Sequence, residues 1–124
     1  MKRMRISQIQ PEPIPTATPI EGWTGGEVRR TRQNLLPEGE SKYFTSSVVN
    51  FELGATTGWH RHNSDQILVI TAGNGIVANE QQQVEVAVGD MVQILAGENH
   101  WHGATKDSYM SHITITCSEG LSTG

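Results

Sequence analysis

The chain has 124 residues, of which 35% are hydrophobic and 18% charged, and its formal net charge is −4. A chain of this length forms one domain with a modest core. It lacks the basic stripe of a nucleic-acid-binding protein, and no apolar run approaches the roughly 20 residues that cross a bilayer. We therefore expect a cytoplasmic protein with neither nucleic-acid nor membrane partners. The single cysteine, Cys117, excludes an internal disulfide and a site built on paired cysteines.

The first 40 residues differ in composition from the rest of the chain, because all five prolines lie there. The proline-rich run 11–19 can form at most an extended or edge strand, since proline lacks the N–H that a ladder needs. We predict that residues 1–40 form an N-terminal arm with edge strands. Residues 1–20 are expected either to lie across a surface or to be partly disordered. Residues 41–124 form the main body of the domain.

From Tyr43 onward, short runs rich in Val, Ile, Thr and Phe alternate with turn signals that contain Gly, Asn or Asp. No segment keeps the 3.6-residue period of an amphipathic helix for long. This pattern predicts an all-β antiparallel sandwich or small barrel. The predicted strands are 44–53, 66–72, 75–79, 84–88, 91–95, 99–104 and 109–117. The main predicted turns lie at 73–75, 80–83, 89–90 and 106–108.

The five histidines are the clearest functional signal. His60 and His62 are separated by one residue, as are His100 and His102, and His112 stands alone. In a strand, residues two apart point to the same side, so each pair can direct two imidazoles into one cavity. Imidazole is the commonest protein ligand for a transition metal. The sequence therefore predicts a metal site built from histidines.

Glycines at fixed distances from these histidines extend the pattern. The first block is Gly54-x5-His60-x-His62-x3-Gln66-x6-Gly73, and the second is Gly89-x7-Gly97-x2-His100. The two blocks resemble the two cupin motifs over about residues 45–117. The resemblance implies a double-stranded β-helix, which is a small antiparallel β-barrel of jelly-roll type. It also implies one divalent metal ion held by His60, His62, Gln66 and His100.

The chain departs from the usual cupin pattern at three positions. It has Gln66 where the family usually has Glu, Leu95 where it usually has Pro, and Ala104 where it usually has Asn. The last two departures affect loop shape more than chemistry. Three imidazoles and one amide are all neutral, so a bound divalent ion would keep its full +2 charge and act as a strong Lewis acid. Such a site favours proton-transfer and lyase chemistry over oxidation.

A narrower resemblance concerns small bacterial cupins that include carboxymuconolactone-decarboxylase-like proteins and manganese-dependent hydroxynitrile lyases. It is carried by His60-Arg61-His62, by the runs 66–73 and 100–105, and by Met110-Ser111-His112-Ile113. These lyases use three histidines and a glutamine as ligands. The resemblance implies manganese, with iron, zinc, nickel or cobalt as alternatives. Cupins of this kind pair through N-terminal strands, so a homodimer or homotetramer is expected, with residues 23–28 available to cover a sheet edge.

Two histidines remain as candidate acid–base groups once the ligands are assigned. His112 is expected to lie in mid-strand beside the metal and to act as the base, while His102 positions the substrate or stabilises a developing anion. Alternatively, either ring only orients a ligand. The alternation of residues 109–117 places Met110, Thr114 and Thr116 in the interior with His112. By resemblance to the lyases, Ser47 and Val49 line the substrate pocket, and Leu68 belongs to its wall as a packing residue.

These residues leave three functions open. The first is a metal-dependent lyase, decarboxylase or isomerase that acts on a small carbonyl or anionic compound, with hydroxynitrile-lyase-like activity as one form. The second is an iron-dependent dioxygenase on the same ligands. The third is a cupin that binds a small molecule without catalysis. Because cupins host all three classes, fold alone does not choose among them.

Overall fold

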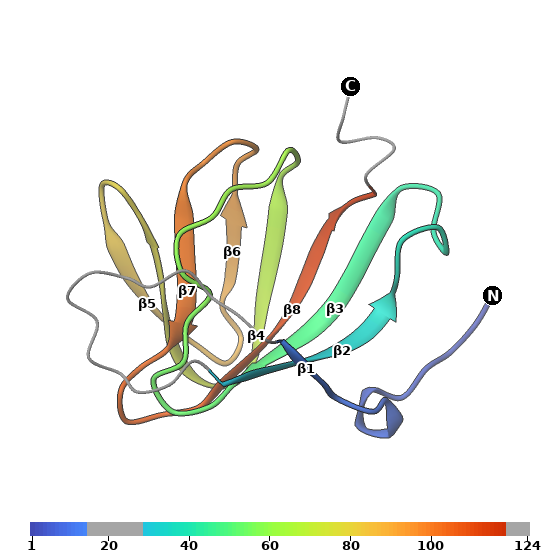
Figure 1. Ribbon diagram of the computed structural model, residues 1–124, viewed down its shortest axis with the longest axis horizontal. Coiled ribbons are helices and arrows are strands. Elements are labelled where there is room, and N and C mark those ends of the chain that lie inside the picture. The colour runs from blue at the N-terminus through green and yellow to red at the C-terminus, as the bar shows by residue number, and fades with distance from the viewer. Residues whose placement is uncertain (15–28, 119–124) are drawn as a thin grey trace.

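The structure is a computed structural model that describes residues 1–14 and 29–118 (Figure 1). The segment 23–28, expected to cover a sheet edge, lies outside the described residues. The regular secondary structure of the described part is all strand except for one short 3₁₀ helix, η1 (Ile6–Gln8). The strands are β1 (Glu12–Ile14), β2 (Arg30–Leu36), β3 (Phe44–Phe51), β4 (Gln66–Asn79), β5 (Gln83–Ala87), β6 (Met91–Ile94), β7 (His100–Ala104) and β8 (Met110–Cys117).

The strands form two antiparallel sheets that share β4. In the first sheet the order is β1-β2-β3-β8-β4, and β6 pairs with the other edge of the first half of β4. In the second sheet, β5 and β7 pair with the second half of β4. Figure 1 shows β4 between β8, β3 and β2 on one side and β5, β6 and β7 on the other. This confirms the predicted small antiparallel barrel.

The turn predicted at 73–75 is wrong, because β4 runs unbroken through it. Gly73 has a φ of 70°, and a Cβ there would collide with the backbone carbonyl oxygen of Tyr109. The register between β4 and β8 also shifts between Ile70 and Ala72. A bulge and a glycine together let a strand bend sharply without ending. Here they carry β4 from one sheet into the other, which closes the barrel.

The N-terminal segment lies against the outer face of β2. β1 pairs with β2 as the outermost strand of the first sheet. The side-chain amide of Gln33 donates hydrogen bonds to the carbonyl oxygens of Ile6 and Ile9, at 2.9 and 3.0 Å.

Within the described part of the chain, no helix has the length and apolar composition needed to span a membrane.

The interior of the barrel has an apolar part and a polar part. Phe51, Leu68, Ile70 and Met110 are at most 2% exposed and form the centre of the core. Along β8, the inward residues change from Met110 and His112 to Thr114 and Thr116. This change places a polar cavity at the end of the barrel where the sequence predicts the metal site.

Candidate metal centre

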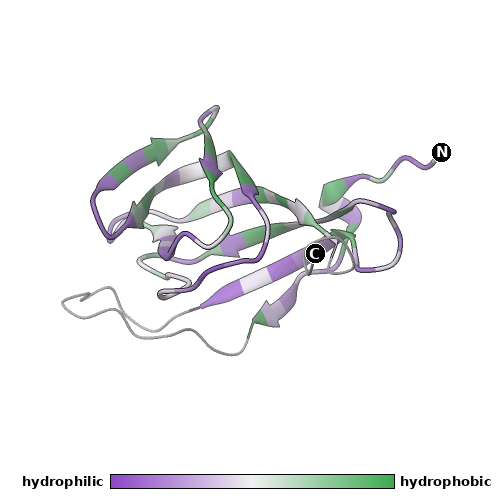
Figure 2. Ribbon diagram, turned by 90° about the horizontal axis from the view of Figure 1, so that it is seen from above, coloured by the Kyte–Doolittle hydropathy of each residue, from purple (hydrophilic) through white to green (hydrophobic). Residues whose placement is uncertain are grey.

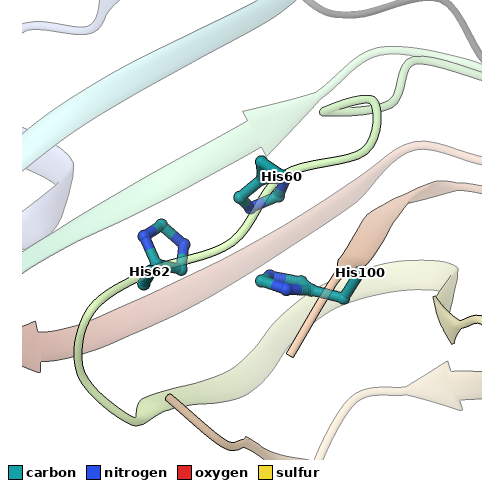
Figure 3. Close-up of side chains that lie close together, drawn as sticks. All are labelled: His60, His62 and His100. Atoms are coloured by element: carbon teal, nitrogen blue, oxygen red, sulfur yellow. The ribbon is translucent and has the colours of Figure 1, made fainter. Parts of the chain in front are cut away.

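Three histidines meet at this polar end. His60 and His62 lie in the loop between β3 and β4, and His100 begins β7 (Figure 3). One nitrogen of each ring lies within 4.8 Å of the others. The spacing of His60 and His62 predicts a strand, whereas the structure has a loop that one isolated β-bridge holds in place. In that bridge, His60 and His100 exchange backbone hydrogen bonds of 2.8 and 2.9 Å.

Backbone carbonyls select the tautomer of two of these rings. His60 Nδ1 lies 2.8 Å from the carbonyl oxygen of Gly58, and His100 Nδ1 lies 2.9 Å from that of Glu98. A carbonyl oxygen only accepts, so each Nδ1 carries the proton and donates it. The Nε2 lone pair of each neutral ring is then left for another partner. This is the usual way in which a protein orients a metal-ligating histidine.

Gln66 is oriented in a similar manner. Its side-chain nitrogen donates to the hydroxyl of Thr114 at 2.7 Å, which turns Oε1 the other way. Oε1 of Gln66, Nε2 of His62 and Nε2 of His100 are all buried, and none has a hydrogen-bond partner among the described residues. A buried acceptor without a partner costs about 1–3 kcal/mol. The three histidines thus form a possible metal site, and the donor set of imidazole and amide fits a divalent transition metal.

A second pair of histidines lies directly behind the first group. Nε2 of His112 and Nδ1 of His102 are 3.0 Å apart, so one ring donates a hydrogen bond to the other. The ring of His102 is stacked on that of His100, with centroids 5.6 Å apart and an interplanar angle of 13°. The Phe51 ring contacts both His102 and His112, at centroid distances of 5.9 and 5.4 Å. These contacts hold the pair in place beside the possible metal site.

Burial lowers the pKa of all five histidines. Loss of solvent is the largest cause in each case, and it brings the pKa of His100 and of His112 to about 4. The pKa of His102 falls well below its usual range, because burial and the nearby His112 both disfavour a charged ring. The rings are therefore neutral near pH 7, which is the form that can bind a metal or accept a proton.

Acid is expected to destabilise the metal-free protein. Between about pH 6.5 and pH 4 the unfolded chain binds protons on these histidines and the folded chain does not, so the free energy of unfolding falls as the pH decreases through this window. His112 alone accounts for about 3 kcal/mol of that loss. Urea denaturation of metal-free protein at several pH values measures it. His112→Gln, which does not titrate, should reduce the slope, and a constant stability from pH 7 to pH 4 would contradict the assignment.

A cavity of about 410 Å³ opens beside the histidines. His60, His62, Gln66, His102 and His112 contribute to its wall. Of the residues predicted to line the substrate pocket, Ser47, Val49, Thr114 and Thr116 do so. Leu68 and Met110 instead lie in the hydrophobic core, both with 0% exposure, and are not part of the cavity wall. Met110 was predicted to face the interior and Leu68 to be a packing residue, and both lie in the apolar part of the barrel.

The part of the wall that β2 supplies was not evident from the sequence. Arg30, Arg32, Asn34 and Leu36 line the cavity from this strand, and Pro37 and Glu38 continue the wall beyond it. All five residues from Arg30 to Asn34 are polar, so this segment resembles a solvent-facing surface when its sequence is taken alone. Only the pairing of Arg32 with Val49 and of Asn34 with Ser47 shows that this face points inward.

Comparisons with known proteins agree with the architecture. The family model described as "Cupin domain" matches residues 47–116. The chain is 34% identical to an (R)-mandelonitrile lyase from Granulicella tundricola, in an alignment that covers 72% of this chain and 82% of that protein. It also resembles two solved structures. A cupin-like protein from Thermotoga maritima has a TM-score of 0.72, 29% identity and coverage of 82% of each chain. A polyketide cyclase from Streptomyces resistomycificus has a TM-score of 0.76 and 19% identity, with 96% of this chain and 80% of that chain covered.

The family match spans more than half of the chain and includes β4, β5, β6 and β7 with most of β3 and β8. It therefore contains the three histidines of the possible metal site together with His102 and His112. The barrel topology and the position of these histidines lead to the same conclusion as the match. The protein belongs to the cupin family.

Proposed function

We propose that the protein is a metal-dependent lyase that acts on a small hydroxy or carbonyl compound, with α-hydroxynitriles as the first candidates. The observation that carries the proposal is the group of neutral donors at one end of the barrel, with a hydrogen-bonded histidine pair beside it. The relationship to an (R)-mandelonitrile lyase supports the same class of reaction. A site with only neutral donors is better suited to polarising an oxygen than to changing oxidation state.

His60, His62, His100 and Gln66 would hold one divalent ion, with manganese the first choice and iron, zinc, nickel or cobalt as alternatives. When bound, such an ion supplies Lewis acidity toward a substrate oxygen. Hydrogen bonds within the chain orient these side chains without a bound ion. The carbonyls of Gly58 and Glu98 fix two imidazole tautomers, and Thr114 fixes the orientation of the Gln66 amide.

The histidine pair would carry the proton. In the cleavage of an α-hydroxynitrile, the hydroxyl proton leaves, the C–O bond becomes a carbonyl, and the C–C bonding pair departs with cyanide, which then takes up a proton. His102 and His112 both line the cavity and are neutral near pH 7. His112 is proposed as the base and His102 as the ring that holds the substrate oxygen. The 3.0 Å hydrogen bond lets the two rings share the proton.

Metal analysis combined with a substrate panel tests this function. Purified protein is assayed with α-hydroxynitriles, hydroxy acids and oxo acids, with and without oxygen, and carbonyl and cyanide release are measured. We expect turnover that is lost on chelation, restored by one divalent ion per chain and independent of oxygen. Turnover that consumes oxygen would instead identify an iron-dependent dioxygenase. Binding without turnover of any compound would identify a non-catalytic cupin.

A further inference from the structure

Two arginines of β2 lie on the wall of the cavity. Arg30 and Arg32 are two residues apart on one strand, so their side chains point to the same side. Arg32 is paired with Val49 of β3, which also lines the cavity, and Val49 is in turn paired with His112 of β8. Figure 1 shows β2 beside β3, and Figure 2 shows that most of β2 is hydrophilic. The arginines are therefore part of the same interior surface as the histidine pair.

The two guanidinium groups are close enough to affect each other. Arg30 is half-buried, and loss of solvent followed by the charge of Arg32 lowers its pKa. Both arginines line the same cavity as His60. Arg32 is exposed, so the two arginines lie at different depths on the cavity wall. Two like charges on one partly buried wall are complementary to an anion, and guanidinium groups bind carboxylates with two parallel hydrogen bonds.

The rest of the cavity wall is poorly suited to a neutral aromatic compound. Among the described residues that line it, the apolar ones are Leu36, Pro37 and Val49, and there is no Phe, Tyr or Trp. The one carboxylate among them is Glu38, against two arginines. A small polar anion would therefore find more complementary partners here than an aromatic ring would.

We infer that Arg30 and Arg32 form a carboxylate-binding subsite, so that the natural substrate is a small hydroxy or oxo compound with a carboxylate at the end remote from the reacting carbon. This inference rests on the proposed function and narrows its substrate class. The carboxylate lies against β2, and the hydroxyl or carbonyl oxygen faces the histidines. The arginines act in binding and orientation, not in the chemical step.

A binding experiment that needs no turnover tests the subsite. Isothermal titration calorimetry compares 4-hydroxybutanoate with its neutral amide, 4-hydroxybutanamide, which has nearly the same size. We expect the carboxylate to bind at least about tenfold more tightly, as charge-assisted paired hydrogen bonds allow. The preference should persist in the metal-free protein, because the arginines provide it. Equal affinities, no binding of the carboxylate, or a preference that vanishes with the metal would overturn the inference.

Variants of neighbouring arginines give matched controls. Arg32→Gln and Arg30→Gln are each expected to remove most of the preference, and Arg32→Lys to keep only part of it. Arg29→Gln should leave the preference unchanged, because Arg29 is 66% exposed and its guanidinium lies 3.8 Å from the Glu52 carboxylate, away from this cavity. Arg32 is exposed, so its replacement tests the subsite even if the Arg30 variant folds poorly. An Arg32 variant with the full preference would contradict its role.

Measurements of turnover distinguish the carboxylate subsite from the proposed lyase reaction. The cyanohydrins 4-cyano-4-hydroxybutanoate and 4-cyano-4-hydroxybutanamide are assayed with metal-loaded protein. If the charged compound has the higher kcat/KM and Arg32→Gln removes that advantage through KM, both are supported. Equal cleavage of both compounds, with no binding preference, would contradict the carboxylate subsite but not the proposed lyase reaction. A binding preference without cleavage of either compound would leave the subsite standing and count against hydroxynitrile cleavage.

Discussion

Replacing His60 or His100 with alanine is expected to abolish metal binding. Each variant removes an imidazole whose Nε2 is prepared for coordination by a carbonyl at Nδ1. With only neutral donors, the site has no carboxylate to compensate electrostatically for a lost ligand. Metal content after dialysis against a weak chelator measures the effect, and we expect less than about a tenth of the wild-type occupancy, consistent with the usual 10–100-fold cost of disturbing a metal site.

Arg61 provides the matched control for these variants. It lies between His60 and His62 in the same loop, and its side chain is exposed. Arg61→Ala is expected to keep the metal, which would separate loss of a ligand from disturbance of the loop. Full metal occupancy in a His60 and His100 double variant would show that the metal binds elsewhere.

As the fourth proposed ligand, Gln66 would control the charge of the site as well as its geometry. Gln66→Ala should weaken metal binding, because it removes the amide oxygen that Thr114 orients. Gln66→Glu should retain the metal, since a carboxylate is also a good ligand, but lower the affinity for added anions such as cyanide or azide. Its negative charge would reduce the net charge at the site from +2 to +1. An unchanged anion affinity in this variant would argue against a role for the neutral amide in the chemistry.

The sequence predicted the metal-site residues better than the cavity around them. The paired histidines predicted a metal site, and the resemblance to the cupin motifs implied that His60, His62 and His100 belong to it, because both signals depend on local spacing along the chain. Strand alternation placed Met110, Thr114 and Thr116 on the interior face, and the resemblance to the lyases placed Ser47 and Val49 beside the pocket. Neither distinguished the cavity from the apolar core, so Leu68 and Met110 were assigned to the pocket although they lie in the core.

Two features depended on long-range pairing and were not evident from local sequence. Gly73 and Gly75 resemble a turn locally, yet β4 continues through them because β8 approaches the backbone at Gly73 and β7 pairs with β4 at Gly75. Arg30 and Arg32 appear solvent-facing when taken alone. Their place on the cavity wall follows from the register of β2 against β3.

Replacing either histidine of the pair His102 and His112 is expected to have the second large effect, which is on turnover. Replacing His112 or His102 with alanine is expected to lower kcat by at least about a hundredfold, since general base catalysis contributes 10²–10⁴-fold. Both variants should keep the metal, because neither ring belongs to the group formed by His60, His62 and His100. The measurements are metal content, kcat and KM on the substrate that the panel identifies. Phe51→Leu, which alters the packing around both rings without removing either, is the control for disturbed packing.

The roles of the two rings can be distinguished by whether each alanine variant changes kcat alone or KM as well. If His112 is the base and His102 positions the substrate, His112→Ala lowers kcat with little change in KM, whereas His102→Ala also raises KM. The 3.0 Å hydrogen bond makes the effects non-additive, because losing either ring disables the pair, so the double variant should be little worse than His112→Ala. A near wild-type His112→Ala with an inactive His102→Ala would reverse the roles. Full activity in both single variants would mean that neither ring takes the proton.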